Sequence, residues 1–179
     1  MKRIGLIAAI ATAVTVGGVY ATWNYATGTA TKATQTISAG LSAVDVNTAK
    51  GDISVDTKGL TFTIEQDKPS FNAMLLISGS IKVTFTAADG ADQDVIDNGI
   101  NMQYTIKESF GEYKGVDVFT VTSTAISLGT AKEVTIPAAD LAENIRLGAI
   151  NLPTKAAYDE FAGVLKAGQF TFTFSEVAA

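Results

Sequence analysis

The side chains that could perform acid–base chemistry in this chain are two pairs of carboxylates. Glu108 lies four residues before Glu112, and Asp159 is next to Glu160. Two carboxyl groups that face each other across a cleft can hydrolyse a glycosidic bond. Acids at these spacings are also typical of solvated strand ends and helix surfaces. We interpret these acids as solvated surface residues. The sequence therefore predicts no catalytic residue, and the protein is not expected to be an enzyme.

The strongest candidate for a cation site is the acidic segment at residues 89–99. It places carboxylates at Asp92, Asp94 and Asp97. A calcium-binding EF-hand loop needs oxygen ligands at alternate positions and a glycine at the sixth. Counted from Asp92, the sixth position is Asp97, so the motif fails. A solvated hairpin loop is the preferred interpretation, and no metal or cofactor is predicted.

The chain contains no histidine and no cysteine. The usual zinc and copper ligands are therefore missing, as are the Ser-His-Asp and Cys-His nucleophile systems. A chain without cysteine must be held together by core packing, by sheet hydrogen bonds or by assembly with neighbours. Most enzymatic classes are excluded on these grounds.

Residues 1–21 have the pattern of a secretory signal peptide. Lys2 and Arg3 form a positive segment, 13 mostly apolar residues follow at 4–16, and small residues at Val19 and Ala21 occupy the positions that signal peptidase recognises. This apolar run is shorter than the roughly 20 residues of a membrane-spanning helix. We expect cleavage between Ala21 and Thr22, which would leave no membrane anchor and a secreted protein at the cell surface or in the extracellular matrix.

Cleavage would make an acidic protein more acidic. The chain has a net charge of −5, and removal of Lys2 and Arg3 changes it to −7. Such a surface repels phosphate backbones and anionic lipid headgroups, so nucleic-acid and membrane-surface binding are disfavoured.

Residues 22–33 are predicted to be an N-terminal arm, followed by one domain at 34–179. The arm consists mainly of small and hydroxyl-bearing residues without strong periodicity, which is typical of a flexible terminal segment. A disordered tail with no role in assembly is the alternative interpretation. Small side chains can enter a groove beside an open sheet edge without clashing. The predicted arm residues are Trp23, Asn24, Tyr25, Ala26, Thr27, Gly28, Thr29 and Ala30.

The domain shows period-two alternation of apolar and polar residues, which predicts strands with one buried face. A first strand is expected over Thr34–Val46, with a bulge near residue 43. Turns are expected at residues 67–69, 78–79, 97–99 and 114–115. The alternating apolar sets are Leu60, Phe62 and Ile64; Ile81, Val83 and Phe85; Met102, Tyr104 and Ile106; Phe119 and Val121; and Phe170, Phe172 and Phe174.

Two helices are expected before the last strand. One covers residues 137–147, and the other covers residues 153–166 with Pro153 at its first position. An apolar stripe marks the second helix at Tyr158, Phe161, Ala162 and Leu165, and Gly168 ends it. The predicted fold class is mainly β: a jelly-roll-like antiparallel sandwich with one or two short helices before the last strand.

Residues 17–24, 37–43 and 168–175 contain three short segments that together resemble the TasA and camelysin family of secreted biofilm-matrix fibre proteins. Residues 17–24, Gly-Gly-Val-Tyr-Ala-Thr-Trp-Asn, are similar to the cleavage region of that family. Residues 37–43 are similar to its first strand, and residues 168–175 to its closing strand. The resemblance implies a structural subunit cut by a dedicated signal peptidase. It also implies a head-to-tail homopolymer formed by strand donation from the N-terminal arm, with an accessory matrix protein as a further partner.

Two other functions remain open at this stage. One is a secreted carbohydrate-binding or surface adhesin module, for which the available rings are Trp23, Tyr25, Tyr104 and Tyr113. The other is a hydrolase that uses the paired carboxylates. The fibre subunit is the leading hypothesis.

Overall fold

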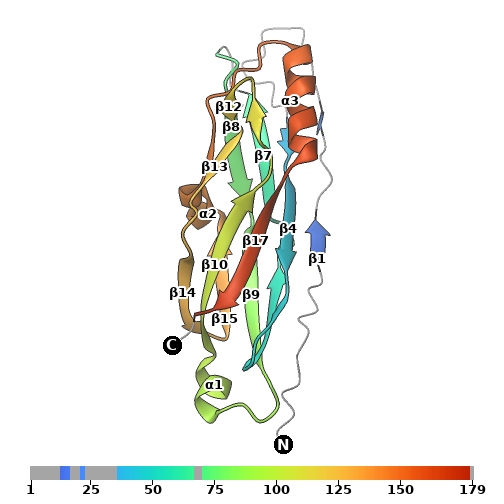
Figure 1. Cartoon of the computed structure of the whole chain (residues 1–179). Coiled ribbons are helices and arrows are strands. Elements are labelled where there is room, and N and C mark those ends of the chain that lie inside the picture. Colours follow the sequence, from blue (N-terminus) through green and yellow to red (C-terminus); the bar gives the residue numbers. More distant parts are fainter. Residues whose placement is uncertain (1–12, 17–20, 23–35, 67–69, 178–179) are drawn as a thin grey trace, which may run out of the picture.

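The computed structural model of the chain describes residues 13–16, 21–22, 36–66 and 70–177 (Figure 1). In these ranges the chain forms short strands and three helices. The strands are β1 (Ala13–Val16), β2 (Ala21–Thr22), β3 (Thr36–Ser38), β4 (Gly40–Val44), β5 (Val46–Asn47), β6 (Gly51–Asp56), β7 (Thr61–Gln66), β8 (Ala73–Ser78), β9 (Ser80–Ala87), β10 (Ile100–Glu108), β11 (Glu112–Tyr113), β12 (Val116–Asp117), β13 (Phe119–Val121), β14 (Ile126–Ala131), β15 (Glu133–Pro137), β16 (Ile145–Leu147) and β17 (Gln169–Glu176). The helices are α1 (Gln93–Asn98), α2 (Ala138–Asn144) and α3 (Lys155–Ala167).

One long sheet has the strand order β1-β4-β17-β10-β14 (Figure 1). β10 is antiparallel to β17 and β14, and β1 is antiparallel to β4. β4 and β17 instead run parallel, with Leu41 opposite Phe170 and Ala43 opposite Phe172. The last strand of the chain therefore lies in the centre of the sheet, beside one of the first strands of the domain.

Two four-stranded sheets form the second layer, with the orders β15-β9-β6-β5 and β2-β3-β7-β8. Every pair in them is antiparallel. Phe62 on β7 faces the long sheet, because its ring centroid lies 4.7 Å from that of Phe170 and 6.4 Å from that of Phe172. The predicted class, a mainly β sandwich with short helices before the last strand, is confirmed. The parallel β4–β17 pair departs from the purely antiparallel prediction.

The core lies between the two layers and includes most of the alternating residues that the sequence singles out. All members of the sets at 60–64, 81–85, 102–106 and 170–174 are buried. Near α3 the core is aromatic: Phe110, Phe119 and Phe170 have pairwise ring centroids 4.7 to 4.8 Å apart, and Phe62 joins them through Phe170. These four residues are called the aromatic cluster below. Each buried Phe side chain contributes about 1.5–3 kcal/mol of hydrophobic stabilisation.

The prediction of one strand over Thr34–Val46 with a bulge near residue 43 is wrong. Residues 36–47 form β3, β4 and β5, which belong to three different sheets. The chain changes sheets at Ala39 and at Asp45, whose carboxylate accepts a hydrogen bond from the Val55 N–H at 2.8 Å. Alternation continues through the first of these breaks, so the inward face is still predicted correctly. Its buried residues are Ala39, Leu41 and Ala43.

The second predicted helix is confirmed as α3, but it begins two residues later than expected. The Thr154 side-chain oxygen caps it by accepting a hydrogen bond from the Ala157 N–H at 3.2 Å. Pro153 therefore precedes the cap instead of opening the helix. Gly168 ends the helix with an extended φ of −117°, and a side chain there would place its Cβ 2.5 Å from the Phe110 ring. Packing, and not a left-handed cap, explains this glycine.

The first predicted helix is shorter than expected. α2 ends at Asn144, and residues 145–147 form β16, which pairs with β13. Pairing with β13 gives β-branched Ile145 a place in a sheet, where its side chain is buried. Leu141 within α2 is buried as well.

The hairpin-loop interpretation of residues 89–99 is wrong for residues 93–98, which form α1. Two side-chain contacts span four residues along this helix: the Gln93 amide donates to Asp97 at 2.9 Å, and the Asn98 amide donates to Asp94 at 2.6 Å. No residue of α1 is buried. The segment is therefore solvated, as predicted, although it is helical.

The predicted turn at Lys114–Gly115 is confirmed as a two-residue hairpin between β11 and β12, with φ of 53° and 79°. Gly79 lies at another predicted turn and has a φ of 87°, and a Cβ there would lie 2.1 Å from the Gly59 carbonyl oxygen. The turn expected at residues 67–69 lies outside the described residues. None of the helices in the described ranges has the length and apolar composition needed to cross a membrane.

Candidate functional site

The outer edge of β4 is the part of the fold on which the predicted strand donation can be examined. β1 occupies this edge in antiparallel register, with Ala13 opposite Val44 and Val16 opposite Leu41 (Figure 1). β1 lies within the predicted signal peptide, so the predicted cleavage would remove it. β4 would then keep a hydrogen-bonding partner on one side, where it pairs with β17.

β4 has the composition of a strand whose edge is open to a second chain. Its core-facing residues Leu41 and Ala43 are buried, and Ser42 between them is 8% exposed. Gly40, Ser42 and Ala43 are small, so an added strand would meet mainly the backbone here. Unpaired N–H and C=O groups along a sheet edge are a template for pairing with another chain.

The predicted cleavage site lies in a paired strand. Ala21 and Thr22 form β2, in which they are opposite Ile37 and Thr36 of β3. The rest of the predicted arm, residues 23–30, lies outside the described residues. The arm is therefore a prediction from the sequence, apart from Thr22, which pairs within its own chain.

The carboxylates considered for catalysis make local contacts. Glu108 accepts a hydrogen bond from the Phe110 N–H at 2.8 Å, just after β10 ends. Asp159 forms an ion pair with Lys155 one turn earlier on α3. Glu160 accepts a hydrogen bond from the Tyr113 hydroxyl at 3.3 Å, and Glu112 is an exposed residue at the start of β11. Three of the four acids thus hold neighbouring structure in place.

The acids considered for cation binding are dispersed around α1. Asp94 and Asp97 each accept an amide hydrogen bond from the same helix, and Asp92 precedes the helix without a side-chain cap. Within the described ranges, no three acidic residues are grouped in a way that could hold a metal ion.

Two of the four rings considered for sugar binding are buried. Tyr104 is 1% exposed and stacks on Phe174 with ring centroids 5.7 Å apart, and Tyr113 is 4% exposed. Burial raises the pKa of Tyr104, and the negative charge of Asp140 raises it further. Neither ring can stack on a sugar, which corrects that part of the adhesin hypothesis. Trp23 and Tyr25 lie outside the described residues.

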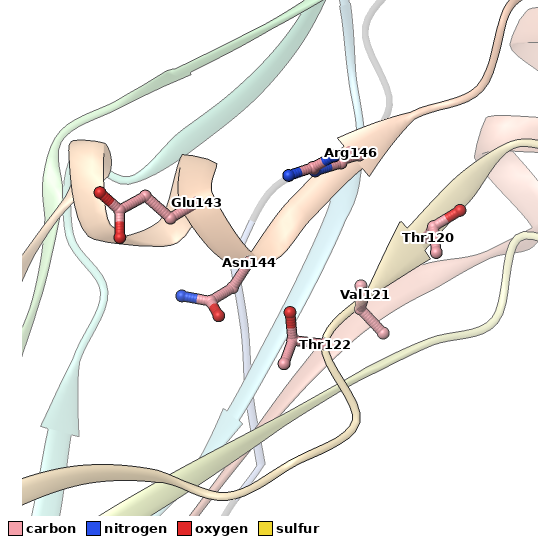
Figure 2. Close-up of a pocket in the computed structure, with 6 residues that line it drawn as sticks. All are labelled: Thr120, Val121, Thr122, Glu143, Asn144 and Arg146. Carbon is pink, nitrogen blue, oxygen red and sulfur yellow. The ribbon is translucent and has the colours of Figure 1, made fainter.

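A second candidate site is a shallow pocket of about 270 Å³ beside the β13–β16 ribbon (Figure 2). No local sequence pattern marks this pocket, because its residues come from two segments more than 20 positions apart. One signal was available: Arg146 is one of two arginines in the chain, the other being Arg3. The residues that line the pocket are Thr120, Val121, Thr122, Glu143, Asn144 and Arg146.

No protein-family model, curated protein or solved structure matches the chain. Function is therefore inferred from the β4 edge, the pocket and the sequence.

Proposed function

We propose that the protein is a secreted, non-enzymatic structural subunit of an extracellular or biofilm-matrix fibre. In this proposal the N-terminal arm of one subunit, freed by signal peptidase, adds a strand to the β4 edge of the next subunit. The observation that carries the proposal is that the β4 edge accepts an added strand, β1, from the predicted leader.

The arm has a sequence suited to replace β1. β1 has Val14 and Val16 two positions apart with Thr15 between them, and the arm has Thr27 and Thr29 at the same spacing with Gly28 between them. In the register of β1, positions 14 and 16 are opposite Ala43 and Leu41. A strand with this alternation can present one set of residues to the core side and the other to solvent.

Strand donation also accounts for growth into a fibre. The donor arm and the acceptor edge are different surfaces of one subunit, so the contact is head-to-tail. A head-to-tail contact that does not close into a ring propagates as a filament. Backbone pairing stabilises each joint by roughly 1 kcal/mol for each hydrogen bond formed.

The absence of cysteine from the chain allows a direct test by disulfide cross-linking. One processed chain carries Gly28→Cys in the arm, and a second carries Ser42→Cys on β4. Mixing the two under mild oxidation should yield a covalent heterodimer on a non-reducing gel, because a disulfide between separate chains needs an intermolecular contact. Scanning the arm cysteine over residues 26–30 locates the register.

The matched control places the acceptor cysteine at Thr130 on β14, the opposite edge of the same sheet. Cross-linking at Thr130 as strong as at Ser42, or none at either position, would contradict the proposal. Electron microscopy of the processed chain with and without residues 22–33 gives an independent result. Filaments that persist without the arm would also exclude strand donation.

The alternative, a carbohydrate-binding or adhesin module that uses exposed aromatic rings, has less support. Tyr104 and Tyr113 are buried in the core. Carbohydrate recognition through aromatic rings would then depend on Trp23 and Tyr25, both of which belong to the predicted arm.

A further inference from the structure

The pocket of Figure 2 is built on an antiparallel ribbon. Thr120 on β13 is opposite Arg146 on β16, and the buried Ile145 is opposite Val121. The Thr122 N–H donates to the Asn144 carbonyl at 2.9 Å and so joins the two segments where the ribbon ends. Alternation along β16 turns Ile145 into the core and leaves Arg146 exposed.

The polar groups of the pocket are available to a ligand. The Asn144 amide nitrogen donates to the Asp140 carbonyl at 2.8 Å, which leaves its side-chain oxygen as an acceptor. The hydroxyls of Thr120 and Thr122 have no hydrogen-bond partner among the described residues. Figure 2 shows Thr122 and Arg146 pointing toward the same space from the two sides of the pocket.

Arg146 is the one arginine among the described residues, and like Lys58, Lys107, Lys132 and Lys166 it forms no ion pair there. Lys50, Lys82, Lys114 and Lys155 each form an ion pair with a carboxylate. No described residue forms an ion pair or side-chain hydrogen bond with Arg146. An arginine presents planar N–H donors that bind a carboxylate through two parallel hydrogen bonds. Here those donors lie beside a pocket that also holds hydroxyl and amide groups.

We propose that this pocket binds a hydroxy carboxylate of the size of one sugar ring, such as a uronic acid residue. Arg146 would bind the carboxylate, while Thr120, Thr122 and the Asn144 oxygen would bind the hydroxyl groups. A volume of about 270 Å³ is just below the usual range of small-molecule pockets, which suits a single ring. Glu143 at the rim would accept a hydrogen bond from a further hydroxyl group of the ligand. Its negative charge would disfavour a second anionic group on the ligand. This proposal does not depend on fibre formation.

The test is a saturation-transfer NMR titration of the purified full chain, which observes the ligand and works for free and assembled protein alike. The three probes are sodium glucuronate, glucose and sodium acetate, which separate the carboxylate from the hydroxyl groups. We expect glucuronate to bind with a Kd on the order of 1 mM. Glucose and acetate should each bind at least about tenfold more weakly, because each lacks one half of the recognised groups.

Two variants and a control assign the binding to the pocket. Arg146→Gln should weaken glucuronate binding at least about tenfold, and Arg146→Lys should have an intermediate effect because a lysine lacks the planar pair of donors. Lys58→Gln removes an exposed charge elsewhere that has no ion pair among the described residues, and it should leave the Kd unchanged. Both positions are exposed, so unchanged thermal unfolding of all three variants should confirm the fold.

Several results would overturn the proposal. Acetate binding as tight as glucuronate binding would indicate charge attraction alone, and glucose binding as tight would indicate a neutral-sugar site. Binding that persists in Arg146→Gln, or no binding of glucuronate at all, would also contradict it.

Discussion

The two ends of the sandwich each carry a helix, but only one of these helices belongs to the core. α3 and α1 lie at opposite ends in Figure 1. α3 buries Ala157, Tyr158, Phe161 and Leu165, and the Phe161 ring lies 5.2 Å from that of Tyr113. α1 buries none of its residues and is held by amide–carboxylate contacts on its own surface.

This difference shows that helix formation and contribution to stability are separate properties. The α3 end contains the aromatic cluster and the start of β17, so side chains there are enclosed on all sides. The α1 end joins β9 to β10 with polar and acidic residues that water solvates well. We therefore expect substitutions at the α3 end to change the free energy of unfolding and those at the α1 end to change it little.

The largest effect is expected from Phe170→Ala. Phe170 is fully buried and contacts the rings of Phe62, Phe110 and Phe119, so its truncation should lower the free energy of unfolding by about 3–5 kcal/mol. Urea unfolding monitored by circular dichroism measures the change. Ile96→Ala on α1 is the control, because Ile96 is 38% exposed and should cost less than about 1 kcal/mol. Similar losses at both ends would break the comparison.

Alkaline pH should also lower the free energy of unfolding, through a tyrosine at the α3 end. Burial, with the charge of Asp159 adding to it, raises the pKa of Tyr158 to about 12. Between pH 10 and 12 the unfolded chain releases this proton while the folded chain retains it, so stability is complete below pH 10 and falls as pH rises. The loss should reach about 3 kcal/mol at most.

The measurement is urea unfolding of wild type and Tyr158→Phe between pH 8 and pH 12. The variant should lose most of this slope, although Tyr104, whose pKa is also raised, should leave a residual one. An identical pH dependence in the two proteins would show that Tyr158 is not the group responsible.

Two glycines separate packing from helix propensity at the α3 end. Gly168→Ala would place a methyl group 2.5 Å from the Phe110 ring and should cost about 1–3 kcal/mol. Gly163→Ala lies within α3 with no atom within 4 Å of the added carbon, and it should stabilise the protein by about 0.5–1 kcal/mol. Thermal unfolding of both variants tests whether Gly168→Ala destabilises the protein and Gly163→Ala stabilises it. Destabilisation by both variants would show that the open space beside Gly163 does not make a methyl group tolerable there.

The smallest effect is expected from Asp94→Ala on α1. The substitution removes the acceptor of the Asn98 amide but exposes no buried group, so the change should be less than about 0.5 kcal/mol. Thermal unfolding checks it. A loss above about 1 kcal/mol would show that α1 supports the fold as α3 does.

Alternation in the sequence predicted which residues face the core, because burial of one face follows directly from the geometry of a strand. It could not predict how the strands divide among sheets, since Ala39 keeps the alternating pattern while the chain changes layer. β8 was not predicted because residues 73–77 are all apolar, although Met74 and Leu76 are exposed. Apolar and polar residues therefore do not alternate along its sequence. The strands at 51–56, 126–131 and 133–137 were not predicted either.

The two candidate sites differ in how far the sequence could foresee them. The leader and the small-residue arm are local patterns, and both stay predictions. The pocket depends on the pairing of Thr120 with Arg146, a contact between residues 26 positions apart that no local pattern encodes. An arginine that is one of two in an acidic chain was its available signal.

The central position of β17 has a consequence for synthesis on the ribosome. β4 and β10 lie on either side of β17 and do not pair with each other, so residues 169–176 must leave the exit tunnel before these two halves can join. Until then the β1–β4 pair and the β10–β14 pair can form only as separate parts of the long sheet.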